Sequence, residues 1–331
     1  MVITRTPFRV SFFGGGTDYP AWFKEHGGAV LATSIDKYCY ISLRPLPPFF
    51  RHKHRVVYSS IENVQSIDEI QHPSVRETLR WADVDQGLEI HHDGDLPARS
   101  GLGSSSSFTV GLVHALQALK GMQISKEELA TLAIHIEQDL IKEHVGSQDQ
   151  VSVTHGGFNR IEFHRNGHYS LEPVIVPDGR FTELQDHLML FFTGFSRIAA
   201  EVAKSKIENL SKREASLKEM RAMVDEAIGI LRNPATPLRE FGHLLHEAWR
   251  RKRTLSDQVS STEIDAIYQT AMDAGALGGK LLGAGGGGFM LVFAEPCRQT
   301  AIRERLSRLI HVPFRFEDSG SRIVLYQPNG L

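Results

Sequence analysis

The chain has 331 residues, a formal net charge of −2 at pH 7 and a pI near 6.8, so no global charge attracts it to nucleic acid or to an anionic membrane. Its length exceeds one comfortable hydrophobic core, and we therefore expect two domains with a cleft between them. No apolar run reaches the roughly 20 residues of a membrane-spanning helix. The first residues do not look like a secretion signal, so we predict a cytoplasmic protein.

The two cysteines, Cys39 and Cys297, are far apart in the sequence and lie in apolar or strand-like settings. We predict that both are buried thiols in a reducing compartment, not a disulfide or a metal pair. The 16 histidines lack the spacing and the neighbouring Cys or carboxylate residues that are typical of zinc sites.

The first half of the chain alternates predicted strands with helices. Ser125 with Glu128 three residues later indicates a capped helix start. Pro177-Asp178-Gly179 is a strong turn signal, and we place the domain boundary there, giving domains 1–180 and 181–331. We expect strands over 3–13, twice within 28–43, and over 56–58, 88–90, 151–153, 157–164 and 169–176, and helices over 74–81, 104–120 and from 125 onward.

The second half has long helical patterns between short apolar strands. Its charged residues are most simply explained as a solvated helix face. The cluster Arg250-Arg251-Lys252-Arg253 is favourable at a helix C-terminus for dipole reasons alone, and a phosphate role stays open. We expect strands over 188–193, 289–294, 314–316 and 322–326, and helices over 199–232, 238–255, from 262 onward and over 298–310.

A small-residue turn, from Pro97 to Ser107, lies between a predicted strand and a predicted helix. Gly101 and Gly103 allow close backbone approach, and the N–H groups at a helix start attract anions. A phosphate-rich ligand is one interpretation of this turn. An ordinary capped helix after a polar turn is the other.

Three further positions are candidates for chemistry, each with a structural alternative. Arg9 lies within an apolar strand, where its side chain reaches an edge or points into a site. Asp18 follows the Gly14-Gly15-Gly16 break, which is otherwise a plain turn with a solvated carboxylate. Glu137 borders the apolar face of its helix, where a surface role is the alternative, and Asp149 follows a glycine-rich segment with polar neighbours that could orient it.

The glycine run from Gly278 to Gly288 excludes two common nucleotide motifs. Gly283, Gly285 and Gly288 have dinucleotide-site spacing, but a strand follows them where that fingerprint needs a helix. Gly279-Lys280 suggests a P-loop, yet Leu281 stands where Ser or Thr would bind magnesium.

Taken together, the three glycine segments give the chain a family resemblance. The chain resembles the GHMP small-molecule kinases over nearly its whole length. The resemblance rests on the order and separation of three segments: Thr6 to Val10 with the Gly14 run, Pro97 with Gly101 to Ser106, and Lys280 to Phe289. Within that family the chain looks most like the heptose 7-phosphate kinases, and the L-fucokinases come next. Four segments carry this likeness: Phe12 to Tyr19, Ile35 to Ile41, Gly146 to Gln150 and Thr193 to Arg197.

The resemblance implies an α+β, two-domain fold with ATP and Mg²⁺ bound between the domains. The N-terminal domain would be mixed α/β with a left-handed crossover, and the C-terminal domain ferredoxin-like. Asp149 matches the catalytic carboxylate, Arg9 the basic residue beside it, and Ser105 with Glu137 the magnesium ligands. The nucleotide would be held by Pro97, Arg99, Ser100, Gly101, Leu102, Gly103, Ser104, Ser105 and Ser106, and the sugar by Gly16, Thr17, Asp18, Arg197, Gly285, Gly286 and Gly287.

The implied reaction is ATP-dependent phosphorylation of the anomeric hydroxyl of D-glycero-D-manno-heptose 7-phosphate, and the implied partners are small molecules. Candidates for binding the acceptor's own phosphate are Arg197, Lys204 and Arg99, in falling order. The alternatives are an L-fucokinase-like enzyme for an unphosphorylated sugar and a non-catalytic sensor of sugar and ATP. The chain departs from the family pattern at Phe8, where many members have Gly, and at Gly15, where sugar kinases often have Glu. A monomer and a homodimer both remain open.

Overall fold

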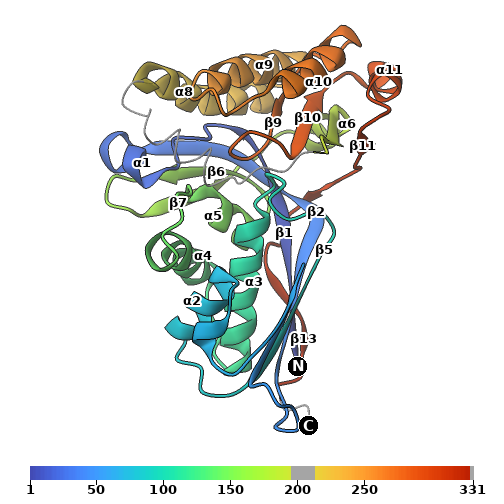
Figure 1. The fold of residues 1–331 in the computed structure, drawn as a ribbon. Helices are drawn as coiled ribbons and strands as arrows, with labels where there is room; N and C mark the ends of the chain where they lie inside the picture. The colour runs from blue at the N-terminus through green and yellow to red at the C-terminus, as the bar shows by residue number, and fades with distance from the viewer. Residues whose placement is uncertain (195–212, 329–331) are drawn as a thin grey trace.

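The computed structural model describes residues 1–194 and 213–328, which form a large sheet and a small sheet, each with its own helices. Figure 1 shows the small sheet with helices α8, α9 and α10 at one end and the long strands β1, β2 and β5 reaching the other. The chain therefore has the α+β class and the two-part architecture that the sequence predicts.

Strands β1 (Val2–Phe13) and β2 (Gly28–Pro45) form the centre of the large sheet and pair antiparallel along most of their length. The expectation of two short strands within 28–43 was wrong. Pro7 pairs with Tyr38 and the next residue, Phe8, pairs with Ile35, so Asp36 and Lys37 form a bulge within one continuous strand. A bulge leaves residues unpaired and bends a strand without ending it.

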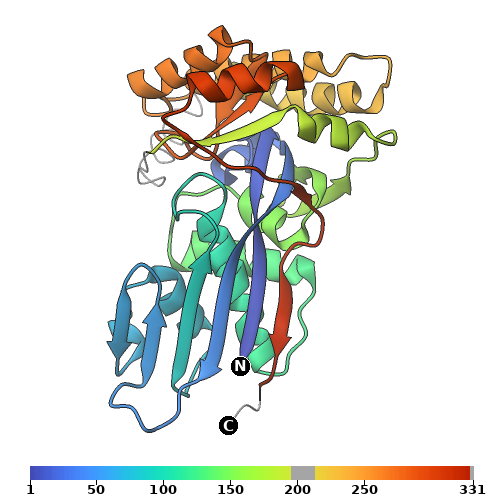
Figure 2. The ribbon, with the colours of Figure 1, turned by 90° about the vertical axis from the view of Figure 1, so that its right-hand side faces the viewer.

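The remaining strands of the large sheet come from both ends of the chain. Figure 2 shows the row of strands from β13, along one edge, through β1, β2 and β5 to β3 and β4. Strand β3 runs parallel to β5, and the chain between them passes through β4 and helix α2; the left-handedness of this crossover stays a prediction. The other members are β3 (His54–Val57), β4 (Ile61–Val64), β5 (Leu88–Gly94), β6 (Phe158–Phe163), β7 (Tyr169–Pro173), β12 (Phe316–Glu317) and β13 (Arg322–Tyr326).

The C-terminal strands bear on the domain division. Strand β13 pairs with β1 and strand β12 pairs with β2, so the end of the chain belongs by hydrogen bonding to the large sheet. A division at residue 180 stays a prediction. The last two strands follow residue 180 in the sequence but belong to the sheet of the N-terminal part.

The helices of the large sheet follow local signals except at one place. The capping box of Ser125 and Glu128 starts α4 as predicted. The expectation of an extended 151–153 was wrong, because the β-branched Val-Ser-Val run lies inside helix α5 and packs against α3 and α4. The helices are α1 (Pro20–His26), α2 (Pro73–Trp81), α3 (Ser104–Leu119), α4 (Lys126–His135), a π-helical turn (Ile136–Leu140) and α5 (Gln148–His155).

The small sheet has the strand order β11-β8-β10-β9 and is antiparallel throughout. Numbered along the chain, this is the order 4-1-3-2 with helices in the two crossovers, which confirms the ferredoxin-like expectation. The described part of the predicted helix 199–232 is helical. The elements are α6 (Arg180–Asp186), β8 (Leu188–Phe192), α8 (Glu214–Arg232), α9 (Arg239–Arg253), α10 (Thr262–Asp273), β9 (Gly278–Leu281), β10 (Phe289–Phe293), α11 (Gln299–Arg305) and β11 (Ile310–His311).

Aromatic side chains join the two units. The ring of Phe241, on α9, lies 5.6 Å from Phe12 and 5.2 Å from Phe13 by centroids, and both of these residues are on β1. All three are buried. Burying large aromatic surface at this junction holds the units in one orientation and so fixes the space between them.

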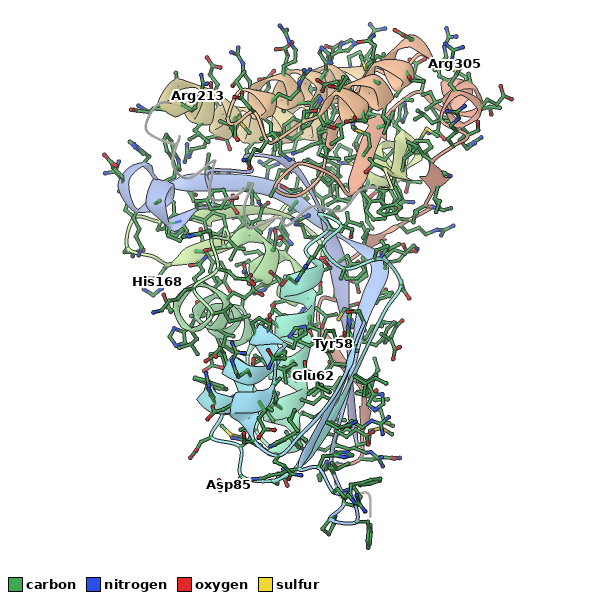
Figure 3. The ribbon with its side chains drawn as sticks, in the orientation of Figure 1. Tyr58, Glu62, Asp85, His168, Arg213 and Arg305 are labelled. Atoms are coloured by element: carbon green, nitrogen blue, oxygen red, sulfur yellow. The ribbon has the colours of Figure 1, made fainter. Side chains whose placement is uncertain are left out.

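One polar contact secures the outer part of the large sheet. Glu62, on β4, accepts a hydrogen bond from the hydroxyl of Tyr58 at 3.0 Å and from the backbone N–H of His72 at 3.1 Å. Figure 3 shows Tyr58 and Glu62 next to each other, far from Arg213 and Arg305 in the helical layer. Because His72 precedes α2, this carboxylate stabilises the start of that helix.

Of the two cysteines, Cys39 is buried as predicted and burial raises the pKa of its thiol. Cys297 is exposed, so that prediction was wrong: the residue lies in a short 3-10 turn (Pro296–Arg298) after strand β10, not within the strand. In the described ranges 1–194 and 213–328, every helix is too short or too polar to cross a bilayer.

Candidate active site

A pocket lies between the two units and collects residues that are far apart in the sequence. Its walls come from β1 and the glycine turn after it, from the start of α3, from the segment between the π-helical turn and α5, and from α9 and β9. The described residues that line it include Arg9, Ser11, Gly15, Gly16, Asp18, Tyr19, Arg99, Gly101, Gly103, Ser104, Ser105, Ser106, Glu137, Glu143, His144, Gln148, Asp149, Lys252, Lys280, Gly283 and Ala284.

Arg9 and Asp149 form a two-pronged ion pair in this pocket. The Nε and Nη2 groups of Arg9 donate to the two carboxylate oxygens of Asp149 at 2.8 and 2.7 Å. The third arm, Nη1, donates to the carbonyl oxygen of Gly101 at 2.7 Å. Because the guanidinium is only 3% exposed and the carboxylate 25%, the arginine is fixed while the aspartate faces the pocket.

The start of α3 presents uncapped backbone donors to the same pocket. Gly103 is the N-cap residue in a left-handed conformation, with φ of 75°, and no side chain caps the helix. Nearby, the hydroxyl of Ser104 accepts a hydrogen bond from the backbone N–H of Arg99 at 3.0 Å, which fixes the turn. An uncapped helix start with free N–H groups binds anions such as phosphate.

The second glycine segment packs directly against this turn. A Cβ on Gly283 would lie 2.5 Å from the Cα of Gly101, so the two backbones touch. Phe289 donates its N–H to the carbonyl of Ser100 at 3.1 Å. Two of the glycines predicted to border the sugar lie against Val259. Gly286 donates its N–H to the carbonyl of Val259 at 3.0 Å, and a Cβ on Gly285 would lie 2.7 Å from Val259. In this segment, Gly283 and Ala284 are among the residues that line the pocket.

Glu137 is buried in the π-helical turn beside the start of α3. Its Oε2 accepts hydrogen bonds from the hydroxyl of Ser106 at 3.0 Å and from the amide of Gln150. Burial raises the pKa of Glu137 to about 7, and the neighbouring Glu143 adds to that effect. The nearby hydroxyl of Thr109 opposes the rise. Oε1 is buried, and no hydrogen bond of good geometry reaches it within the described chain.

This environment fits a divalent cation next to bound phosphate. A buried carboxylate oxygen without a partner is costly unless a ligand completes it. Magnesium is commonly held by one or two protein oxygens together with substrate phosphates. The structure pairs Glu137 with Ser106, whereas Ser105 is exposed and lines the pocket without contacting that carboxylate. Within the described ranges, no group of three or more His, Cys, Asp or Glu side chains could hold a metal by itself. A cation at Glu137 would therefore need the phosphates of a bound substrate as further ligands.

Asp18 faces Asp149 across the turn after β1. Its Oδ1 accepts the N–H of Gly16 at 2.8 Å, and a Cβ on Gly146 would collide with its Oδ2. Burial raises the pKa of this carboxyl, Asp149 adds to the rise, and the Gly16 hydrogen bond opposes it. The hydroxyl of Thr17, by contrast, is bonded to Gly14 and Ala29 and does not line the pocket.

Two lysines in the pocket were missed from the sequence. Lys252 donates to the carbonyls of Leu281 and Gly283, both at 2.7 Å, and Lys280 donates to the carbonyl of Phe12 at 2.7 Å. Both are buried. Lys252 was hidden in a basic run that resembles a solvated helix end, and Lys280 in a motif that was rejected as a P-loop.

The candidates for an acceptor phosphate are only partly described. Arg99 lines the pocket and has a left-handed backbone, with φ of 58°. Such a conformation is uncommon outside glycine and is typical of functional turns. Arg197 and Lys204 lie outside the described residues.

Comparisons with known proteins show the family to which the chain belongs. Residues 69–157 match the sequence model of the GHMP kinases N terminal domain, and residues 230–311 match that of the GHMP kinases C terminal region. The D-glycero-alpha-D-manno-heptose 7-phosphate kinase of Campylobacter jejuni is 31% identical over 313 residues, which cover 89% of this chain and 90% of that protein. The fold and both halves of the match define a kinase, an enzyme that transfers a phosphoryl group. The chain belongs to the GHMP kinase family, whose members use ATP as the phosphate donor.

Two further relatives extend the comparison. The L-fucokinase/L-fucose-1-P guanylyltransferase of Bacteroides fragilis is 27% identical over 91% of this chain, which corresponds to 35% of that longer protein. A solved structure of a D-glycero-D-manno-heptose 1-phosphate kinase from Bacteroides thetaiotaomicron has a TM-score of 0.79, with 22% identity over 97% of this chain and 98% of that one. This last likeness establishes the fold.

Proposed function

We propose that the protein transfers the γ-phosphoryl group of ATP to the anomeric hydroxyl of D-glycero-D-manno-heptose 7-phosphate, giving the 1,7-bisphosphate. The relative that is 31% identical over nine-tenths of its length is named as a heptose 7-phosphate kinase, which supports this acceptor. The supply of ATP would place the reaction in the cytoplasm.

The observation that carries the proposal is the ion pair of Arg9 and Asp149 beside the uncapped start of α3. In the transfer, a bond forms between the anomeric oxygen and the γ-phosphorus, and the bond from that phosphorus to the leaving oxygen of ADP breaks. Asp149 accepts or orients the proton of the attacking hydroxyl. Arg9 fixes the position of Asp149, and with it the N–H groups of the Gly101 turn offset the negative charge of the phosphates.

The other pocket residues have supporting roles in the proposal. Ser106 and Glu137 would hold the magnesium ion, which would neutralise charge on the phosphates, and Ser105 would contact the nucleotide from the exposed side of the turn. Asp18, supported by Gly16, would bind a sugar hydroxyl. Arg99 is the described candidate for binding the acceptor's own phosphate, since a guanidinium matches phosphate geometry.

The test is a magnesium-dependent assay of ADP release with a panel of sugars with and without phosphate. We expect turnover with heptose 7-phosphate and a KM for it far below that of any unphosphorylated sugar. Asp149→Ala is the control for ADP that arises without this site. Binding of ATP and sugar without ADP release would favour a sensor over an enzyme and would contradict the proposal.

A second candidate acceptor is L-fucose or a similar unphosphorylated sugar. The 27% identity to the fucokinase relative over 91% of this chain favours it. The same panel separates the two, because a fucokinase would give its lowest acceptor KM with a sugar that carries no phosphate.

A further inference from the structure

One glycine of the pocket has no structural reason to be glycine. Six glycines line the described pocket wall, and five of them are required by the fold. Gly16, Gly101, Gly103 and Gly283 have φ between 69° and 109°, and a Cβ on Gly146 would lie 1.9 Å from a carboxylate oxygen of Asp18.

Gly15 differs from these five. Its φ is outside the left-handed region, and the described atoms nearest to a Cβ placed there are 3.7 Å away, which is ordinary van der Waals contact. An alanine would therefore fit against the described part of the chain. What an alanine side chain would fill is space in the pocket.

The two described atoms nearest to that space belong to polar side chains, each of which has a buried atom without a hydrogen-bond partner in the described chain. They are the hydroxyl of Ser11 and the amide nitrogen of Gln148, each 3.7 Å from the position of the missing Cβ. The hydroxyl of Ser11 and the amide oxygen of Gln148 are buried and have no hydrogen bond within the described chain. Ser11 is 5% exposed. A buried polar atom left unpaired destabilises a folded protein, so a native example calls for an explanation.

We propose that Ser11, Gly15 and Gln148 form a subsite for a hydroxyl group of the acceptor sugar, which lies against the Gly15 backbone. This inference rests on the proposed function and adds the residues that select the acceptor. A serine hydroxyl donates and accepts, and a primary amide offers one donor and one acceptor whichever way it is turned. A sugar hydroxyl also donates and accepts, so it can form hydrogen bonds with both the Ser11 hydroxyl and the Gln148 amide.

The subsite selects a neutral group over a phosphate. The backbone N–H of Gln148 lies 3.5 Å from Asp18 Oδ2, and Asp18 also holds Gly16, so a carboxylate borders the space on one side. Asp149, the next residue after Gln148, places a second carboxylate on the same wall. Asp149 is ion-paired with Arg9, so Asp18 is the carboxylate that repels an anion here, and the acceptor's phosphate lies away from this subsite.

The first test compares two glycine-to-alanine variants. Gly15→Ala is expected to fold with an unchanged thermal midpoint and to raise the acceptor KM roughly tenfold or more, because an added methyl group competes with the sugar for space. The KM for ATP stays unchanged. Gly229→Ala, in helix α8 with no atom within 4 Å of its Cβ position, is the matched control and leaves both KM values unchanged.

The second test uses the unpaired atoms. Ser11→Ala removes a buried hydroxyl that has no partner among the described residues, so we expect an equal or higher thermal midpoint together with a several-fold higher acceptor KM. Gln148→Ala is expected to raise the acceptor KM in the same way. A residue that only supports the fold would give the opposite pattern, a lower midpoint with an unchanged KM.

The outcomes separate this inference from the proposed function. If the wild type turns over heptose 7-phosphate and the acceptor KM of Gly15→Ala and Ser11→Ala matches it, the subsite is wrong and the proposed function stands. If the wild type neither turns over nor binds any sugar of the panel, as followed by thermal shift, both are wrong. A raised acceptor KM in both variants with an unchanged KM for ATP supports the subsite.

Discussion

The two sides of the pocket are built in different ways. On the phosphate side, backbone packs on backbone: Gly101 touches Gly283, and Arg9 is bonded to both the turn and Asp149. On the sugar side, Ser11 and Gln148 present polar atoms that have no partner within the described chain. The backbone frame of the phosphate side is therefore fixed by internal contacts and leaves the N–H groups of α3 and one oxygen of Glu137 for a ligand. On the sugar side, the side chains proposed to contact the ligand lack such internal contacts. Under the proposed function, changes at Ser11, Gly15 and Gln148 would alter the acceptor without disturbing the phosphate side.

The largest effect on turnover is expected on the phosphate side, at the group nearest the transferred atom. Asp149→Asn keeps the shape of the side chain but loses the charge and the proton acceptor, so kcat should fall roughly 100-fold or more. Steady-state kinetics with saturating ATP and sugar measure it. Asp139→Asn, an exposed residue bonded to His135 outside the pocket, is the matched control. Near-normal kcat for Asp149→Asn would rule out a general base.

A smaller loss is expected for Arg9→Lys. The lysine keeps the charge but cannot reproduce the two bonds to Asp149 and the one to Gly101, so kcat should fall about tenfold or more while folding is retained. Arg5→Lys is the matched control, because Arg5 lies on the same strand outside the pocket and its replacement by lysine should leave kcat unchanged. An unchanged kcat for Arg9→Lys would show that the positive charge alone is sufficient and that the rigid geometry is not needed.

Two adjacent serines sharpen the account of the metal. Ser106 is bonded to Glu137 and Ser105 is not, so Ser106→Ala should raise the magnesium concentration for half-maximal rate about tenfold, and Ser105→Ala should change it far less. Titrating magnesium at fixed ATP measures both. The reverse order would return the ligand role to Ser105, as the sequence motif suggested.

The last prediction concerns stability and not turnover, and it tests the charge of Glu137. Its pKa is raised from 4.5 to about 7, so the native state holds a proton that the unfolded state releases between these values. Without magnesium, stability should fall as pH rises from 4.5 to 7, in total by on the order of 3 kcal/mol, and Glu137→Gln should remove this slope. Urea unfolding of both proteins at pH 5 and pH 8 checks it. Parallel pH profiles would contradict the buried, metal-free carboxyl.

Local signals in the sequence predicted much of the fold. The capping box at Ser125 predicted the start of α4, and apolar patterns predicted α3 and the strands β8 and β10 of the small sheet. Strand β9 lies in the glycine run and was not predicted, and β11 begins where the sequence predicted the end of a helix. The bulge at Asp36 and Lys37 and helix α5 were mispredicted, because each is decided by contacts with distant segments. A polar run in a paired strand looks like a turn, and a β-branched run in a packed helix looks like a strand.

The candidate site was predictable where one residue type at one spacing is distinctive. Arg9, Asp149 and Glu137 were candidates with structural alternatives until the family resemblance assigned them roles, and they line one pocket. Ser105 and Ser106 cannot be told apart from the sequence, because only the structure shows which of them lies on the side of α3 that contacts Glu137. Lys252 was one of four neighbouring cations, and only the packing of α9 on the glycine segment directs it to the pocket.

The most direct measurement is phosphorus NMR of a reaction of heptose 7-phosphate, ATP and magnesium with the wild-type protein. The account predicts a new resonance from a phosphate on the anomeric oxygen, coupled to the anomeric proton and growing in step with ADP, while the 7-phosphate resonance persists. Release of inorganic phosphate alone, or a new phosphate at any other sugar carbon, would contradict it.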